Sequence, residues 1–241
     1  MQHKSLYEIN ISDILFLDIE TVPLKPDYEE LDEAEKELWD KKADRLAKNE
    51  EDNPENLYSR AGIYAEFGKI VCISCGVATT EERIRVKSFA SKDEKKLLED
   101  FAAMLNKSFS TPSKIMCAHN GKEFDFPYIA RRMLVNGVFL PDILQIAGKK
   151  PWEIQHLDTM ELWKFGDYKN YTSLAVLTHL FDIPTPKDDI DGSDVHRIFW
   201  AENDLDRIVT YCQKDVIATM QLFRRYRNEP LFTDEQIEYA N

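Results

Sequence analysis

The stretch ILFLDIE, residues 14–20, places two carboxylates, Asp18 and Glu20, directly after four consecutive apolar residues. A short apolar run of this kind predicts a buried β-strand. Side chains at positions i and i+2 of an extended chain share a face, so both carboxylates should leave the sheet in the same direction at the strand's end. Two acids held together repel each other, and a divalent cation relieves that repulsion. The stretch therefore predicts a metal-binding strand.

The segments around this strand predict a mixed sheet covered by helices. Two further strands, 69–78 and 83–89, are separated by the polar residues TTEE and are expected to form a hairpin. Later strands are expected at 114–119 and 156–159, each followed by a helix. An antiparallel meander followed by alternating strands and helices indicates the α/β class. No repeat or flexible linker divides the chain, so residues 1–241 are expected to form a single domain.

The helices are expected from their caps and apolar faces. Ser91 and Glu94 have the spacing of a capping box at the start of one helix. A second helix carries Pro127 in its first turn. Its buried face is expected to consist of Ile129, Ala130, Met133 and Leu134. The last long helix should run from about Asp204 to Arg227 and pack an apolar face on the core.

The segment from about residue 26 to residue 56 is strongly acidic. Residues 27–55 hold thirteen Asp or Glu and five Lys or Arg, a net charge of −8. Its apolar residues Leu31, Ala34 and Leu38 follow helical spacing, which predicts a helical insertion on the surface. A solvated insertion is favoured here over a surface that binds a protein partner.

A second group of candidate residues lies in HNGKEFDFPY, residues 119–128. Asp125 comes just before a predicted helix, where the backbone favours negative charge and bound phosphate, although an acidic helix start explains it equally well. Asn120 has the chemistry to hydrogen-bond a substrate or to hold the loop. Phe124 has the shape to stack on a terminal base or to fill the core.

A third group lies on the predicted last helix. Tyr211 and Asp215 are four residues apart in YCQKD, so they share one helix face and can meet a common ligand. For an isolated pair, a tyrosine beside a surface acid is the simpler interpretation. The position of this pair on a core-packed helix is compatible with both.

Together these three groups resemble a known family. The order D-I-E, N-x-x-x-F-D and Y-x-x-x-D is similar to the three exonuclease motifs of the DnaQ-like 3′→5′ exonucleases, which have a ribonuclease-H-like fold. The resemblance is closest to the proofreading domains of family B DNA polymerases and their stand-alone bacterial relatives, and it extends from about Ile14 to Arg227. Because Tyr211 stands four residues before Asp215, the chain resembles the tyrosine (DEDDy) branch.

The resemblance implies a ribonuclease-H-like mixed sheet and a two-metal-ion site. Asp18, Glu20, Asp125 and Asp215 would hold two Mg²⁺ or Mn²⁺ ions. Tyr211 would orient the attacking water, because a phenol keeps its proton at neutral pH. The products would be nucleoside 5′-monophosphates.

The resemblance also implies further contacts around this site. Asn120 and Phe124 would contact the terminal nucleotides of a nucleic-acid 3′ end. Asp158, in HLDTMELW, is similar to an acid that the family often keeps near the site, where it would support the metal ligands from behind. A purely structural hydrogen bond at Asp158 is an equal alternative.

Composition excludes several classes. No apolar run approaches the roughly 18–20 residues of a membrane span, and the first residues lack a signal peptide's apolar stretch, so a cytoplasmic location is expected. Cys72 and Cys75 should point to opposite faces of a strand, which argues against a shared zinc ion. The net charge of −13 at pH 7 argues for weak, metal-dependent binding of nucleic acid.

Three alternatives stay open at this point. An exoribonuclease of the same fold would have the same site, although DNA is favoured as the substrate. A catalytically idle relative would bind a partner through the acidic segment, but all four carboxylates and Tyr211 are present. A structural metal protein is disfavoured by the absence of His and Cys clusters.

Overall fold

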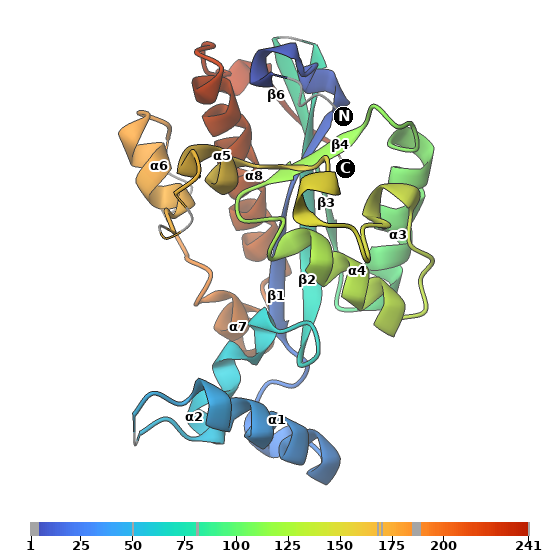
Figure 1. The fold of residues 1–241 in the computed structure, drawn as a ribbon. Helices are drawn as coiled ribbons and strands as arrows, with labels where there is room; N and C mark the ends of the chain where they lie inside the picture. The colour runs from blue at the N-terminus through green and yellow to red at the C-terminus, as the bar shows by residue number, and fades with distance from the viewer. Residues whose placement is uncertain are drawn as a thin grey trace.

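Six strands of the described residues form one mixed sheet in the order β5-β4-β1-β2-β3-β6 (Figure 1). The computed structural model describes residues 5–49, 51–80, 82–167, 169, 171–184 and 189–240. The strands are β1 (Ile14–Pro23), β2 (Gly68–Thr80), β3 (Arg83–Ala90), β4 (Ile115–Ala118), β5 (Leu157–Asp158) and β6 (Ile237–Ala240).

The strand directions match the predicted fold class. β1, β2 and β3 form an antiparallel meander, whereas β4 and β5 extend the sheet in parallel on the other side of β1. The last strand, β6, pairs in parallel with β3 at the far edge and was not anticipated. The chain is therefore an α/β protein with the mixed sheet of a ribonuclease-H-like fold.

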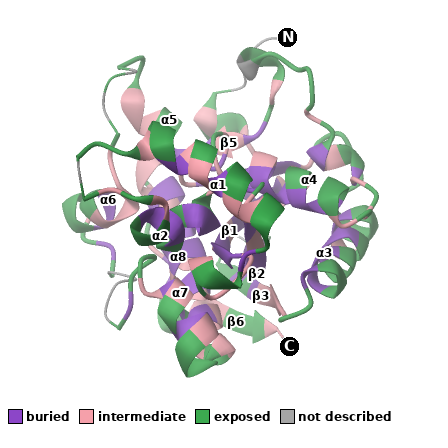
Figure 2. Cartoon of the chain, turned by 90° about the horizontal axis from the view of Figure 1, so that it is seen from below, coloured by how far each residue is buried: buried purple, intermediate pink, exposed green. Residues whose placement is uncertain are grey.

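Helices cover both faces of the sheet (Figure 1). α3 (Glu94–Ser108) and α4 (Asp125–Val135) pack on one face, and α8 (Leu205–Tyr226) packs on the other. Buried residues gather where these helices meet the strands (Figure 2). The other α-helices of the described residues are α1 (Glu33–Leu46), α2 (Pro54–Leu57), α5 (Thr159–Lys164), α6 (Leu174–Leu180) and α7 (Val195–Arg197), and α7 runs into a π-helical turn at Ile198–Glu202.

Alternation along β1 assigns its side chains to the two faces. Leu15, Leu17 and Ile19 pack with α3 and α4. Ile14 and Phe16 pack with α8 on the opposite face. Because Asp18 and Glu20 continue the even-numbered series, they face α8.

β1 is longer than predicted. It continues through Asp18 and Glu20 to Pro23, with a register shift between Glu20 and Thr21, so the carboxylates lie within the strand and not at its end. The reason is that Thr21, Val22 and Pro23 keep pairing with the start of β2.

The acidic insertion contains a helix, α1, as predicted, but the apolar residues that follow helical spacing are not all buried. Leu38 is 58% exposed, whereas Trp39 is fully buried and donates its indole N–H to the carbonyl of Pro54 at 2.8 Å. Buried residues of the insertion and of the segment that directly follows it form a small cluster: Leu31, Trp39, Ala43, Leu57, Tyr58 and Ala61. Helical spacing indicates which residues share a face of α1, but the elements that pack against α1 determine which face is buried.

Two further helix details differ from the predictions. The N-cap of α3 is Asp93, whose carboxylate accepts from the Lys96 amide at 3.1 Å, and not Ser91. Glu94 turns away from the cap to form a buried ion pair with Arg132 of α4. On α4, Leu134 is 66% exposed because Arg132 occupies the buried face to meet Glu94.

The corrected cap gives a stability prediction. Asp93→Ala should lower the free energy of unfolding by about 1 kcal/mol, because the α3 amide loses its side-chain acceptor. Ser91→Ala should cost only about a few tenths of a kcal/mol, since Ser91 accepts a single exposed bond from the Asp93 amide. Urea unfolding of both variants measures the difference. Equal losses, or a larger loss for Ser91→Ala, would contradict the assignment.

Candidate active site

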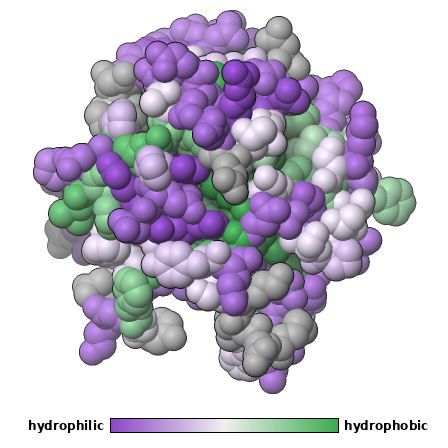
Figure 3. Space-filling model, turned by 90° about the horizontal axis from the view of Figure 1, so that it is seen from above, coloured by the Kyte–Doolittle hydropathy of each residue, from purple (hydrophilic) through white to green (hydrophobic). Residues whose placement is uncertain are grey.

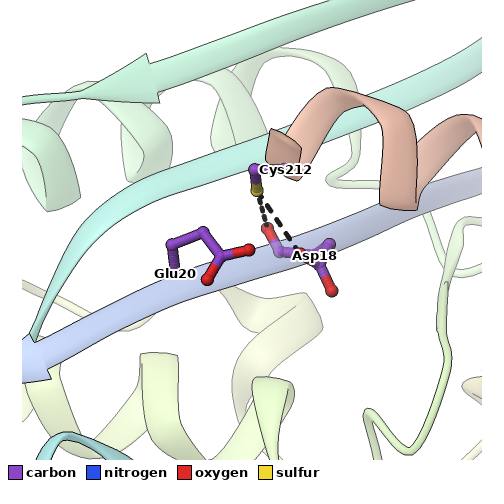
Figure 4. Close-up of side chains that lie close together, drawn as sticks. All are labelled: Asp18, Glu20 and Cys212. Carbon is purple, nitrogen blue, oxygen red and sulfur yellow. Dashed lines mark hydrogen bonds between the residues drawn. The ribbon is translucent and has the colours of Figure 1, made fainter. Parts of the chain in front are cut away.

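The centre of the candidate site is the Asp18–Glu20 pair on β1. Carboxylate oxygens of these residues and the sulfur of Cys212 on α8 all lie within 4.8 Å of one another (Figure 4). The Cys212 thiol lies 3.4 Å from both the backbone carbonyl and the Oδ2 of Asp18, to which it donates. The i, i+2 spacing thus brings the two carboxylates onto one face, as predicted.

Helix α8 adds Tyr211 and Asp215, which are both buried. Burial, followed by the negative charges of Asp215, Glu20 and Asp18, raises the pKa of the Tyr211 phenol far above its usual value. A hydrogen bond between Tyr211 and Asp215 acts in the same direction. The phenol therefore stays protonated, and its single O–H is engaged with Asp215 beside the other carboxylates.

Asp125 reaches the site from the helix on the opposite face of the sheet. β4 pairs with β1 only from Ile14 to Phe16, so the edge of β1 beyond Phe16 is open to the N-terminus of α4. Asp125 is the first residue of α4 and accepts a hydrogen bond from the backbone of Ile19, between the two carboxylates of β1. The short β4 is therefore what lets Asp125 approach Asp18.

Burial raises the pKa of Asp125 to about 8, even though the backbone amides of Asp125 and Ile19 lower it. The charges of Asp158 and Asp215 add to the increase. An all-carboxylate site in which charges repel in this way is poorly stable without a positive partner.

The pKa of Asp18 is also well above its usual value. The causes are burial, then the charges of Asp215, Glu20 and Asp125. The charges of the other three candidate metal ligands thus all act on Asp18. The oxygens of Asp125 and Asp215 nevertheless lie outside the 4.8 Å group that Asp18 and Glu20 form with Cys212.

The residues at this site fit a divalent cation. Carboxylate oxygens suit Mg²⁺ or Mn²⁺, and burial raises the pKa of the Cys212 thiol, which favours the neutral donor over a thiolate ligand. Within the described part of the chain, the buried Oδ1 of Asp125 has no hydrogen-bond partner. A cation is the partner that such an oxygen would accept most favourably.

The loop before α4 carries the two predicted substrate contacts. Asn120 adopts φ = 65°, and its side-chain Oδ1 is buried without a hydrogen-bond partner among the described residues. Phe124 is partly buried, with its ring 5.4 Å from that of Tyr128. The orphaned oxygen of Asn120 is the stronger indication of a ligand, because most of the Phe124 environment is core.

Asp158 holds this loop in place. Its carboxylate accepts from the backbone amides of Asn120 at 2.9 Å and Lys122 at 3.1 Å. It also caps α5 by accepting from the amides of Met160 and Glu161. Asp158 is thus a buried hydrogen-bond acceptor behind the site. Its negative charge also contributes to the raised pKa of Asp125.

Cys212 is the site residue that sequence reasoning missed. It is one of the apolar residues of the last helix and stands three residues before Asp215. That i, i+3 spacing was the available signal. The other cysteines behave as expected: Cys72 and Cys75 are buried free thiols in different core clusters, on opposite sides of β2.

The fold and the acidic site define a class of protein, the exonuclease-like members of the ribonuclease-H-like fold. A family model described as predicted 3′-5′ exonucleases related to the exonuclease domain of PolB matches residues 63–237. The chain belongs to this family. The match contains Asp125, Tyr211 and Asp215, whereas Asp18 and Glu20 precede it.

A solved structure shares the fold. The family B DNA polymerase from the hyperthermophilic archaeon Pyrobaculum calidifontis aligns with a TM-score of 0.54 and 13% identity, over 88% of this chain. The chain spans 24% of the length of that polymerase. No curated protein matches the sequence. None of the helices in the described residues combines the length and apolar character that a membrane crossing requires.

Proposed function

We propose that the protein is a metal-dependent 3′→5′ exonuclease that removes nucleoside 5′-monophosphates from the 3′ end of single-stranded DNA. The observation that carries this proposal is the convergence of Asp215, Glu20 and Asp125 on Asp18, in a chain of the exonuclease family. No structural requirement of the fold explains four acids that destabilise one another. A site that binds cations does explain them.

In this proposal Asp18, Glu20, Asp125 and Asp215 would hold the Mg²⁺ or Mn²⁺ ions. Two such ions supply an activated water and charge stabilisation for the leaving 3′ oxygen. The hydroxyl of Tyr211 donates to Asp215, and its oxygen would orient the attacking water by accepting a hydrogen bond from it. The Cys212 thiol fixes the rotamer of Asp18 by donating to its Oδ2.

The substrate end lies against the loop before α4. Asn120 offers its buried Oδ1 to a donor of the terminal nucleotide, and the partly buried ring of Phe124 packs beside it. Asp158 keeps both residues in position through the loop amides. Phosphate held over the N-terminus of α4 would also meet favourable backbone amides.

The charge distribution agrees with a substrate held mainly at its end. The net charge is −13, and the visible face in Figure 3 is dominated by hydrophilic residues. A chain of this charge gains little from long contacts with the phosphate backbone. Bound cations would therefore supply the positive charge. We place the protein in the cytoplasm, where Mg²⁺ is abundant and thiols stay reduced.

Digestion of 5′-labelled single-stranded DNA and RNA of matched sequence tests this function. With Mg²⁺ or Mn²⁺, a ladder that shortens from the 3′ end is expected, with DNA cleaved faster than RNA. EDTA or Asp215→Ala should abolish the ladder. Faster cleavage of RNA would reassign the substrate, and no cleavage by well-folded protein would contradict the enzyme assignment.

A further inference from the structure

The loop between α5 and α6 presents an aromatic side chain, Tyr171, beside the candidate site. Tyr171 is 68% exposed. The next residue, Thr172, accepts a hydrogen bond through its carbonyl from Nε2 of His119 at 3.0 Å. Since His119 directly precedes Asn120, this bond fixes the Tyr171 loop against the loop that carries the proposed substrate contacts.

His119 is suited to a fixed tether. Burial lowers its pKa, so the ring is neutral at pH 7. Its Nδ1 lies 2.9 Å from the hydroxyl of Thr159, at the start of α5. Both ring nitrogens thus have hydrogen-bond partners, so the His119 ring is held in one orientation and holds Thr172 near Asn120.

The negative charges that act on Tyr171 include that of one candidate metal ligand, Asp125. Partial burial, then the negative charges of Asp158, Asp125 and Glu123, raise the pKa of its phenol. A shallow pocket of about 220 Å³ opens beside the ring, and it is lined by Trp163, Lys164, Asp167, Tyr171 and Thr172. An exposed ring next to a small pocket and a carboxylate site offers a flat surface to a substrate group.

We propose that Tyr171 stacks on a nucleobase at the 3′ end of the substrate strand and so supplies a large part of the ground-state affinity. This inference rests on the proposed function. Stacking is sequence-tolerant, since every base has a π-face. It is also the form of affinity available to a protein of net charge −13, which gains little from phosphate contacts.

Tyr171 and Phe124 differ in how much of the aromatic ring is free to stack on a base. Phe124 is partly buried against the core and against Tyr128, so its ring has limited free surface. The ring of Tyr171 is mostly exposed and stands on a loop that is tethered through His119. A tethered, exposed ring binds a base with little loss of conformational freedom.

Steady-state cleavage of two matched oligonucleotides tests the stacking. One ends in two ordinary nucleosides, and the other ends in two abasic residues. Tyr171→Ala should raise KM for the ordinary end roughly 5-fold to 150-fold, with kcat nearly unchanged. It should leave KM for the abasic end unchanged. Tyr171→Phe keeps the ring and should behave as wild type on both.

Tyr239→Ala is the matched control, because Tyr239 is 56% exposed on β6 at the far edge of the sheet and its loss should change neither substrate's KM. Thermal melting confirms that each variant is folded. An unchanged KM for Tyr171→Ala on the ordinary end, or an equal rise on both ends, would overturn the stacking while the nuclease assignment stands. A wild-type protein that cleaves neither oligonucleotide overturns the proposed function and this inference together.

Discussion

Asp18→Asn should lower kcat/KM on a single-stranded 3′ end by about a thousandfold or more, while it makes the metal-free protein more stable. Burial and the negative charges of the three neighbouring carboxylates disfavour the charged form of Asp18. Asparagine has nearly the same shape but no charge. The variant therefore loses a charged metal ligand, worth about 4 kcal/mol or more of transition-state stabilisation.

The stability gain comes from the same repulsion. Burial and neighbouring charges raise the pKa of Asp18 well above its usual value, so at neutral pH folding must either bury its charge or take up a proton. Asparagine avoids that cost, and a gain of about 1 kcal/mol raises the melting temperature of a chain this size by about 2–4 °C. The measurement is thermal unfolding in EDTA beside activity in Mg²⁺. Asp44→Asn, a change at an exposed carboxylate on α1, should alter neither quantity.

Two outcomes would contradict this expectation. Full activity in Asp18→Asn would remove Asp18 from the metal site. A large loss of stability in EDTA would mean that the carboxylate is stabilised by contacts within the protein, such as the Cys212 thiol, more than it is destabilised by its neighbours. Opposite changes in activity and stability are typical of a site selected for function.

Much of the fold could be predicted because its signals are local. Alternation along an extended strand predicts that Asp18 and Glu20 share one face, and the pairing of both residues with β2 confirms the extended chain on which that prediction depends. The last helix begins and ends where predicted, since Asp204 caps it through the Arg207 amide. Such features depend on residues within one turn or one strand of each other.

The remaining features depend on where distant elements lie. No local pattern shows that β4 ends early enough for Asp125 to reach the backbone of Ile19. The exposed Leu38 and Leu134 have helical spacing that is equally compatible with burial. Their faces were decided by Trp39 and by the Arg132–Glu94 ion pair, both of which require a partner that only the folded chain supplies.

The acid cluster itself illustrates the same limit. The sequence indicated which carboxylates to consider, but not that the Cys212 thiol contacts Asp18 or that Asp158 is engaged with four backbone amides. These contacts join β1 to α8 and the α4 loop to α5. Packing between elements sets the contact of Cys212 with Asp18 and those of Asp158 with the loop amides, whereas the cap that Asp158 forms on α5 is local.

The metal-free protein should lose stability as the pH rises from about 4 to about 8, because Asp125 is held protonated in the folded state. Its pKa rises from the usual 3.8 to about 8 on folding. Between those values the folded protein binds a proton that the unfolded chain does not. The contribution of Asp125 to the free energy of unfolding is therefore largest below pH 4, and it decreases as the pH rises to about 8. The slope from one group is at most about 1.4 kcal/mol per pH unit.

Urea unfolding at pH 5, 6, 7 and 8 in EDTA measures this slope, and Asp125→Asn should make it shallower. The comparison matters because the net charge of −13 also weakens an acidic protein as the pH rises, and only the difference between wild type and variant isolates Asp125. Saturating Mg²⁺ should flatten the wild-type slope, since a cation takes the place of the proton. A wild-type slope equal to that of Asp125→Asn in EDTA would show that Asp125 is charged in the folded protein without metal, and the electrostatic argument for a cation at this carboxylate would fail.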